Sequence, residues 1–380
     1  MDAITPSVST ELSAHIARHI EAAGGWLPFD EYMALALYAP QLGYYANASR
    51  KFGHMPPRRL SDGSVTDGTD FVTAPELSPL FGACVGEQVA QALAATGTRC
   101  VFEFGAGSGA LALQILELLT QKEYGLEQYF IVDVSGSLRA RQQEALQKFA
   151  GKVTWLSALP EGIEGVIVGN EVLDAMPVKL LARSEGAWHE RGVVVDADRL
   201  AWQDRATDLR PPVEVQGPHD YLTEIHPQAE GFIRTLSVKR TRGAAFFIDY
   251  GFPEAEYYHP QRHMGTLMCH RAHQSDMNPL ELPGEKDITA HINFSGIALA
   301  AQEAGLDVLG YCTQARFLMN CGVLSKLELL GQDLRWREAI SVQKLLTEHE
   351  MGELFKVVGF GKGVSFDALG FQSGDKTHTL

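Results

Sequence analysis

An apolar strand that runs directly into three closely spaced glycines, and then into a helix, constrains the fold of this chain most strongly. Residues 101–111 read VFEFGAGSGAL, in which Gly105, Gly107 and Gly109 are spaced two apart. Glycine lets the backbone turn tightly and approach a ligand without a Cβ in the way. A glycine-rich turn also fits a packing role alone, so the surrounding chain has to separate a cofactor site from a structural turn.

The chain around this turn alternates between short apolar runs and helical stretches. Such alternation is typical of a parallel sheet covered by helices on both faces. It predicts a Rossmann-like α/β domain over residues 97–380. The strands we expect are 101–104, 129–132, 153–156, 165–168, 244–248, 306–311 and 355–360, and the helices between the early strands are 110–119 and 138–149.

Residues 1–96 predict a helical segment and a loop that contribute to the functional site. Thr10 is expected to cap a first helix, in which Leu12, Ile16 and Ile20 share one face. The rest of the segment predicts a helix at 29–38, a loop rich in Gly, Pro, Ser and Asp at 52–68, and a helix at 78–95.

Two polar regions interrupt the α/β repeat and predict insertions on the substrate side. Residues 181–218 contain two tryptophans and suggest a small β-rich unit. Residues 254–293 hold many polar and aromatic groups and suggest a long, ordered loop. We therefore expect one large domain with additions, because no internal repeat divides the chain.

A carboxylate at the end of the second strand favours a nucleoside-containing cofactor. Asp133 follows the strand at 129–132 and lies 24 residues beyond Gly109. From that position it can accept hydrogen bonds from two ribose hydroxyls. Dinucleotides and S-adenosylmethionine share this feature, so the glycine turn itself has to separate them.

The turn favours S-adenosylmethionine. Its glycines depart from the Gly-x-Gly-x-x-Gly order of dinucleotide sites. Glu103 would repel a diphosphate, whereas it can receive the cationic methionine end of S-adenosylmethionine. A nicotinamide-dependent oxidoreductase is the alternative that cofactor binding would exclude. The cofactor contacts predicted here are Glu103, Gly105, Ala106, Gly107, Gly109, Asp133 and Asn170.

Charge and cysteine content argue against several classes of partner. A net charge of −15 leaves no broad basic field for a phosphate backbone, so we expect no nucleic-acid partner. The five cysteines form no disulfide framework, and Cys269 with His273 lacks a second pair, so no metal is predicted. No apolar run reaches the roughly 18 residues of a membrane span, and we expect no membrane insertion.

Longer motifs in the chain resemble those of the MidA-type methyltransferases, whose mitochondrial members assist the assembly of respiratory complex I. The resemblance implies a class I methyltransferase sheet of seven strands, one of them antiparallel, with S-adenosyl-L-methionine as the cofactor. It adds Thr73, Pro75, Gly82 and Val134 to the expected cofactor contacts. The matching motifs are residues 38–45, 70–82, 103–109, 134–135, 138–142, 169–178, 248–251, 256–260, 265–267 and 287–294.

The resemblance also implies a reaction. The mitochondrial relatives imply symmetric dimethylation of a protein arginine, so we expect a protein substrate, with a complex I subunit as the partner that the family suggests. The chain departs from the family at Asp133, where a glutamate is expected, and at Met176, where a leucine is commoner. Neither departure changes the expected chemistry.

Polar side chains at the strand ends are the candidates for the substrate site. Ligands of open α/β sheets lie beyond the carboxyl ends of the strands, and Asn170 and Glu171 directly follow a buried strand. An arginine guanidinium stays protonated, and carboxylates can grip its N–H groups in pairs. The expected catalytic residues are Glu171, Asp174, Asn170, Glu76 and Asp249.

Each of these carboxylates also has a structural interpretation. Asp174 suits a cap after the strand, and Glu171 can bond the neighbouring backbone. Glu76 fits a first helical turn, and Asp249 can brace a loop. The tyrosine pairs at 44–45 and 257–258 and the histidines at 259 and 291 fit either the site or the core.

Three other functions stay open beside arginine methylation. In the first, the same cofactor methylates a small molecule or RNA. In the second, the chain is an assembly factor without catalysis. In the third, the chain is an oxidoreductase whose cofactor is a nicotinamide dinucleotide. The sequence sets no oligomeric state and is compatible with a dimer. The start of the chain resembles neither a signal nor a transit peptide. We expect the cytoplasm for a bacterial source and the mitochondrial matrix for eukaryotic relatives.

Overall fold

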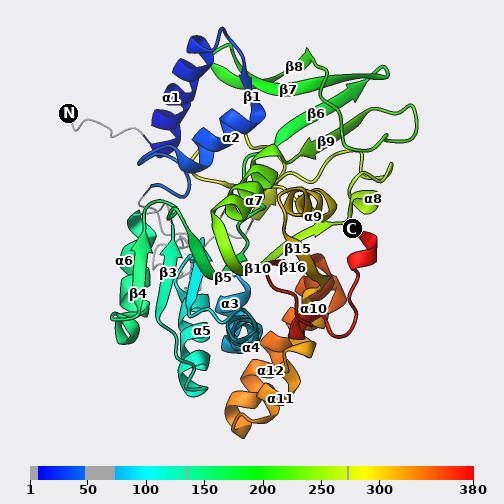
Figure 1. Cartoon of the computed structure of the whole chain (residues 1–380). Coiled ribbons are helices and arrows are strands. Elements are labelled where there is room, and N and C mark those ends of the chain that lie inside the picture. The colour runs from blue at the N-terminus through cyan, green and yellow to red at the C-terminus, as the bar shows by residue number, and fades with distance from the viewer. Residues whose placement is uncertain (1–6, 48–72, 134–135, 272–273) are drawn as a thin grey trace, which may run out of the picture.

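The computed structural model describes residues 7–47, 73–133, 136–271 and 274–380. A central sheet lies between two layers of helices, and a second lobe of strands and N-terminal helices sits at one end of it (Figure 1). Three predictions lie outside the described residues: the loop at 52–68, the cofactor contact of Val134 and the pairing of His273 with Cys269.

The central sheet has the order β15-β16-β10-β5-β2-β3-β4. Strand β16 is antiparallel to both of its neighbours, and the remaining pairs are parallel. This confirms the predicted sheet of seven strands with one antiparallel member; a short eighth strand, β14, also pairs with the end of β10. The strands are β2 (Cys100–Phe104), β3 (Gln128–Val132), β4 (Val153–Leu156), β5 (Ile163–Asn170), β10 (Arg240–Phe252), β14 (Ile292–Asn293), β15 (Asp307–Thr313) and β16 (Phe355–Lys362).

Both faces of the sheet are buried, which explains why its strands lack a polar face. Along β10, Phe246 and Ile248 belong to the core on one side, and Phe247 belongs to the core on the other. The first side is covered by α4 (Pro79–Thr96), α5 (Ala110–Gln121), α10 (Gln314–Asn320), α11 (Val323–Glu328) and α12 (Gln332–Leu346), and the second by α7 (Pro227–Lys239) and α9 (Phe294–Glu303).

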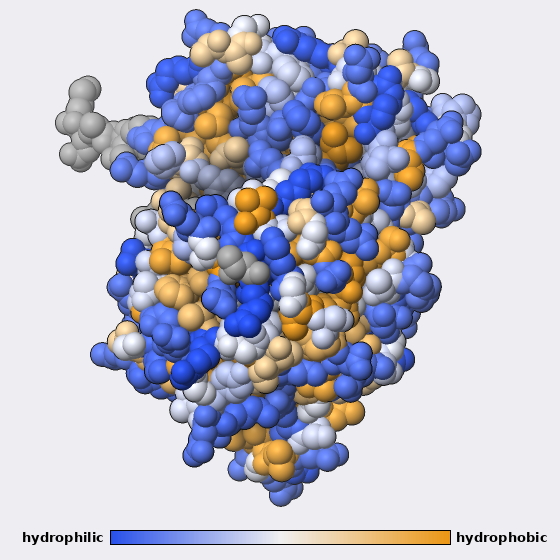
Figure 2. Space-filling model, in the orientation of Figure 1, coloured by the Kyte–Doolittle hydropathy of each residue, from blue (hydrophilic) through white to orange (hydrophobic). Residues whose placement is uncertain are grey.

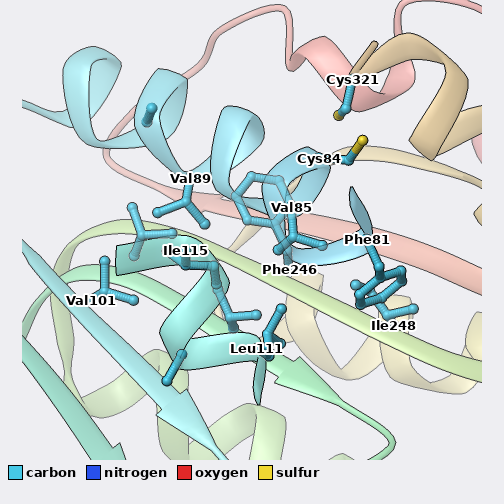
Figure 3. Packing of buried hydrophobic residues seen from close by; sticks show 14 of the residues in the cluster. Phe81, Cys84, Val85, Val89, Val101, Leu111, Ile115, Phe246, Ile248 and Cys321 are labelled. Atoms are coloured by element: carbon cyan, nitrogen blue, oxygen red, sulfur yellow. The ribbon is translucent and has the colours of Figure 1, made fainter. Parts of the chain in front are cut away.

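Helices α4 and α5 pack on the sheet, and α5 begins directly after the glycine turn. Figure 3 shows Phe81 and Val85 of α4 and Ile115 of α5 packed towards Phe246 of the sheet. Each of these side chains contributes about 1.5–3 kcal/mol through burial. A helix predicted over residues 138–149 is instead α6 (Gly136–Ala145), followed by a separate 3-10 turn at Gln147–Phe149.

The N-terminal helices and both insertions share the core of the second lobe. Leu12, Ile16 and Ile20 are buried there, as predicted, together with Val193 and Ile288 from the two insertions. The elements are α1 (Val8–Ala22), β1 (Leu27–Pro28), α2 (Phe29–Tyr38), β6 (Lys179–Ser184), β7 (Ala187–Asp196), β8 (Arg199–Ala206) and β9 (Tyr221–Ile225), with sheet order β1-β7-β6-β9 and β8 beside β7. Strands β6 to β9 cover the region predicted as a β-rich insertion and extend beyond 181–218 at both ends.

Helix α1 begins earlier than predicted. Ser7, and not Thr10, is its N-cap, because the Ser7 hydroxyl accepts the backbone N–H of Thr10 at 3.2 Å. The helix therefore begins at Val8, and Thr10 lies inside its first turn.

The second insertion forms several short elements where a long loop was expected. They are α8 (Glu254–Tyr257), β11 (Met268–Arg271), β12 (Gln274–Asp276) and β13 (Asp287–Thr289), and the three strands form a small antiparallel sheet. The division of the chain into residues 1–96 and 97–380 stays a prediction.

The surface is largely hydrophilic on the face in Figure 2, with hydrophobic residues mostly scattered between polar ones. Scattered apolar residues of this kind are normal for a folded surface. Within the described ranges, no helix combines the length and the apolar character that crossing a bilayer requires.

Candidate active site

The glycine turn joins β2 to α5 and leaves the start of that helix open. Gly109 is the N-cap residue with φ +86°, and among the described residues no side chain caps the helix. A Cβ on Gly109 would lie 3.4 Å from the Cα of Gln142, and one on Gly105 would lie 3.0 Å from a methyl group of Val172. The turn therefore requires glycine, and the free N–H groups of the helix start can bind a carboxylate. Ala106 is buried beneath it.

Two carboxylates flank this turn at the ends of adjacent strands. Glu103 is buried in β2, where its Oε2 accepts the Tyr129 hydroxyl at 2.6 Å. Burial raises the pKa of Glu103 to about 7, and the nearby Asp133 adds to the rise. An ammonium group bound here would restore the ionised form of Glu103. Asp133 follows β3 and accepts an amide N–H of Gln142 at 2.8 Å.

Pro75 and Gly82, two of the contacts expected from family resemblance, lie against Gln114 of α5. Thr73 is the N-cap residue of α3 (Ala74–Leu77). Gln114 of α5 donates to the carbonyl of Pro75 at 2.7 Å and accepts the N–H of Gly82 at 2.9 Å. A Cβ on Gly82 would lie 2.2 Å from the Gln114 amide oxygen. Packing of α3 and α4 on α5 therefore gives Pro75 and Gly82 a structural role, and their contact with the cofactor stays a prediction.

Asp249 braces the loop that follows β5. Its Oδ2 accepts the backbone N–H groups of Val172, Leu173 and Asp174 at 3.2, 2.9 and 3.3 Å, and its Oδ1 accepts the N–H of Tyr250 at 3.1 Å. The carboxylate is thus occupied by backbone donors and is buried. These contacts agree with the structural interpretation, in which Asp249 braces a loop. We therefore expect Asp249 to affect catalysis through the position of that loop.

The loop places Asn170 and Glu171 at the strand end. Glu171 has φ +53°, a backbone conformation that costs a non-glycine residue about 1–3 kcal/mol. Its N–H still donates to the carbonyl of Ile248 at 2.9 Å, and its Oε1 accepts the Asn170 amide at 2.9 Å. Strained residues that the surroundings hold in place cluster at functional sites.

Three of the predicted site residues present buried oxygens that lack a hydrogen-bond donor. They are Oε2 of Glu76, Oδ1 of Asn170 and Oδ1 of Asp174, none of which has a partner among the described residues. Nearly all buried polar atoms of native proteins have one. Three such acceptors from separate segments therefore point to a ligand rich in N–H groups.

Burial also changes the acidity of this group. It raises the pKa of Glu171 to about 8, with contributions from Asp174, Asp287 and Glu76. The Asp174 pKa rises to about 6 through burial, against an opposing interaction with the Tyr250 hydroxyl. We call Glu76, Glu171, Asp174 and Asp287 together the carboxylate pocket. Burial disfavours the ionised forms of Glu171 and Asp174, and a bound cation would favour them.

Three site residues were missed by the sequence prediction: Asp287, Tyr38 and Tyr250. The Tyr45 hydroxyl donates to both oxygens of Asp287, at 2.9 and 3.0 Å. The Tyr38 hydroxyl donates to the carbonyl of Ala175 at 2.8 Å, and its ring stacks on that of Tyr45 with centroids 5.6 Å apart. The sequence signal for these residues lay in the motifs at 38–45, 248–251 and 287–294, which are distant from one another in the chain.

Most of the remaining aromatic and histidine candidates lie outside the site. Tyr44 is part of the second-lobe core, and Tyr257 and Tyr258 hydrogen-bond to a buried glutamate of β9. His259 is exposed. His291 packs on Tyr250, with ring centroids 5.1 Å apart, and burial lowers the pKa of His291 to about 4.

The sheet order, the open glycine turn and the two carboxylates beside it are the features expected of an S-adenosyl-L-methionine-dependent methyltransferase. A family model of S-adenosyl-L-methionine-dependent methyltransferases matches residues 84–312, more than half of the chain, and the protein belongs to this family. The comparisons thus confirm the predicted cofactor, S-adenosyl-L-methionine, and the enzyme class. The nicotinamide alternative is not supported.

Solved and curated relatives agree with this assignment. A Burkholderia thailandensis protein crystallised with S-adenosyl-homocysteine is 48% identical, covers 99% of both chains and superposes with a TM-score of 0.91. The zebrafish protein named protein arginine methyltransferase NDUFAF7, mitochondrial, is 27% identical over 92% of this chain and 86% of its own length. The human protein of the same name is 27% identical over 91% and 82%.

Proposed function

We propose that the protein transfers a methyl group from S-adenosyl-L-methionine to an arginine side chain of a protein substrate. The observation that carries the proposal is a set of three buried oxygens, on Glu76, Asn170 and Asp174, that have no donor within the part of the chain that the structure describes. A guanidinium supplies five N–H donors and a positive charge, which satisfy these acceptors and offset the buried carboxylates.

The arrangement of the three acceptors favours an arginine substrate over a lysine substrate. The acceptors come from α3, from the end of β5 and from the loop after it, so they approach the ligand from several directions. A planar guanidinium with a fork of donors suits that arrangement better than a compact ammonium. The stacked rings of Tyr38 and Tyr45 offer an aromatic face on which a planar cation can lie.

The same carboxylates can handle the proton that the reaction releases. The bound cofactor supplies a methyl group on its sulfonium sulfur, and methylation of a guanidinium nitrogen releases one proton. Glu171, with a pKa of about 8, and Asp174, with a pKa of about 6, lie near neutrality. Carboxyls with pKa values in this range are suited to accept that proton.

The names of the relatives support a protein substrate. Several are named protein arginine methyltransferase and mitochondrial, including those from zebrafish and human. By family resemblance, a respiratory complex I subunit is a candidate substrate for this chain. We expect a cytoplasmic location for a bacterial source, and for a eukaryotic source the mitochondrial matrix.

The test separates cofactor binding from methyl transfer. Wild-type protein and Glu171→Gln are titrated with S-adenosyl-homocysteine, and both are incubated with labelled S-adenosyl-L-methionine and a protein extract from cells that lack this protein. We expect Glu171→Gln to bind S-adenosyl-homocysteine like the wild type and to lose methyl transfer by ~100-fold or more, as removal of a key catalytic group does. Glu161→Gln is the control, because Glu161 is exposed and outside the site.

Each outcome decides between two functions. Loss of transfer with binding retained supports catalysis by the carboxylate pocket. Cofactor binding without transfer by the wild-type protein on any extract would instead support an assembly factor whose cofactor site only regulates binding. Transfer that is equal in wild type and Glu171→Gln would remove Glu171 from the proposed reaction.

A further inference from the structure

One amide links the glycine turn to the carboxylate at the end of β3. Gln142 lies on α6, and its side chain is fully buried. Its Nε2 donates to Oδ2 of Asp133 at 2.8 Å and to the carbonyl of Gly107 at 3.0 Å. Its Oε1 accepts the indole N–H of Trp155, on β4, at 2.9 Å. The amide is therefore bonded to three different segments.

These contacts fix which way the amide points. A carboxylate and a carbonyl can only accept hydrogen bonds, so they must face the amide nitrogen, and the indole N–H can only donate, so it must face the oxygen. Both N–H groups and the carbonyl of the side chain are used. A group with two donors and one acceptor is required at this position, and among uncharged side chains of this length only glutamine provides it.

We propose that Gln142 is a positioning residue that orients the Asp133 carboxylate towards the ribose of the cofactor. This inference rests on the proposed role of Asp133 in the cofactor site. The donor is a neutral amide, so Gln142 holds Oδ2 of Asp133 in place without bringing a positive charge beside it, as a lysine or arginine would do.

The second donor ties the same amide to the cofactor turn. Gly107 has φ +52°, and its carbonyl is held by Gln142. Gly109 also lies close to this residue, since a Cβ on Gly109 would be 3.4 Å from the Cα of Gln142. The Gln142 side chain thus keeps the Asp133 carboxylate and the glycine turn at a fixed separation. Such preorganisation reduces the ordering that the ligand would otherwise have to impose.

The test compares two ligands on two proteins. Binding of S-adenosyl-homocysteine and of an analogue that lacks both ribose hydroxyls is measured by calorimetry for the wild type and for Gln142→Met, an unbranched side chain of similar size. In the wild type, the analogue should bind roughly 10-fold or more weakly, because hydrogen bonds to a charged carboxylate are lost. In Gln142→Met, S-adenosyl-homocysteine should bind roughly 10-fold to 100-fold more weakly, whereas the analogue should lose less affinity, because it loses only the contribution of the glycine turn.

A matched control and a second variant keep the test decisive. Gln143→Leu changes the exposed neighbour on the same helix and should alter neither affinity. Gln142→Leu removes both donors without adding a charge beside Asp133, so it should reproduce the selective loss even if Gln142→Met folds poorly. Equal weakening of both ligands, or no weakening, would overturn the positioning role. Equal binding of both ligands to the wild type would overturn the role of Asp133 itself.

Discussion

The Tyr45 hydroxyl donates to both oxygens of Asp287, at 2.9 and 3.0 Å, across 242 residues of sequence. This contact joins the N-terminal segment to the second insertion at the edge of the carboxylate pocket. Both partners are buried or half-buried, so the pair contributes to the shape of the site as well as to its charge.

Tyr45→Phe should impair the site more than the fold. The substitution removes the donor and leaves the Asp287 carboxylate less well satisfied, which costs about 1–3 kcal/mol in the free energy of unfolding. We expect the KM for the protein substrate to rise and binding of S-adenosyl-homocysteine to stay unchanged. Urea unfolding and steady-state kinetics measure the two effects. Tyr124→Phe, remote from the pocket, is the control, and an unchanged KM in Tyr45→Phe would contradict the prediction.

Asp249→Ala should destabilise the protein through the loop after β5. The substitution takes the acceptor away from the N–H groups of Val172, Leu173 and Asp174. We expect the free energy of unfolding to fall by ~2–4 kcal/mol, as for other buried networks that lose a shared partner. Asp249→Asn retains an acceptor oxygen and should lose less. Equal stability of Asp249→Ala and the wild type in urea would show that the brace is not needed.

The raised pKa of Glu171 predicts that the free protein loses stability as pH rises. The folded state keeps the proton up to a pKa of about 8, whereas the unfolded carboxyl releases it near pH 4.3. Between these values the folded state binds more protons, so the free energy of unfolding falls with increasing pH. Thermal unfolding should therefore show a Tm that decreases from pH 5 to pH 8, by less in Glu171→Gln. An identical slope in the variant would contradict this assignment.

The same ionisations should make activity rise with pH, whereas they make the stability of the free protein fall. A cationic substrate needs ionised carboxylates, so kcat/KM for the arginine substrate should rise with pH through about 6 and about 8, the values for Asp174 and Glu171. The pH profile of Glu171→Gln should lack the upper step. A profile that stays flat between pH 5 and pH 9 would remove these carboxyls from substrate binding.

Gly82→Ala should destabilise the packing of α4 on α5. Its Cβ would lie 2.2 Å from the Gln114 amide oxygen, which overpacks the contact and costs about 1–3 kcal/mol. Gly231→Ala on α7 is the matched control, because a Cβ there meets nothing within 4 Å. The control should gain ~0.5–1 kcal/mol from the better helix propensity of alanine. Chemical unfolding of both variants gives the comparison, and a neutral Gly82→Ala would contradict the packing role.

Local patterns predicted the α/β part of the chain well, because each strand and helix there is marked by its own residues. The apolar run before Gly105 became β2, and the run before Asn170 became β5. The predicted start of α1 was wrong, because both Ser7 and Thr10 suit an N-cap. The hydrogen bond from the Thr10 N–H to the Ser7 hydroxyl identifies Ser7 as the cap.

Long-range pairings account for what the sequence could not predict. Strand β1 pairs with β7 and Tyr45 binds Asp287, although no spacing rule relates these residues. The role of Asp249 depended likewise on the path of the loop after β5, so a bracing carboxylate could not be separated from a catalytic one. Glu171, Asp174 and Glu76 could be proposed from strand ends and motifs. The structure added that buried oxygens of Glu76 and Asp174 have no donor among the residues it describes.

The identity of the methylated residue distinguishes a site for a guanidinium from a site for another methyl acceptor. Protein extract is labelled from radioactive S-adenosyl-L-methionine by the wild type or by Glu171→Gln, then hydrolysed, and the labelled amino acids are separated. We predict that the wild type places label in methylated arginine and that Glu171→Gln places almost none there. Label in lysine, in another residue or in a small molecule would contradict the account of a pocket built for a guanidinium.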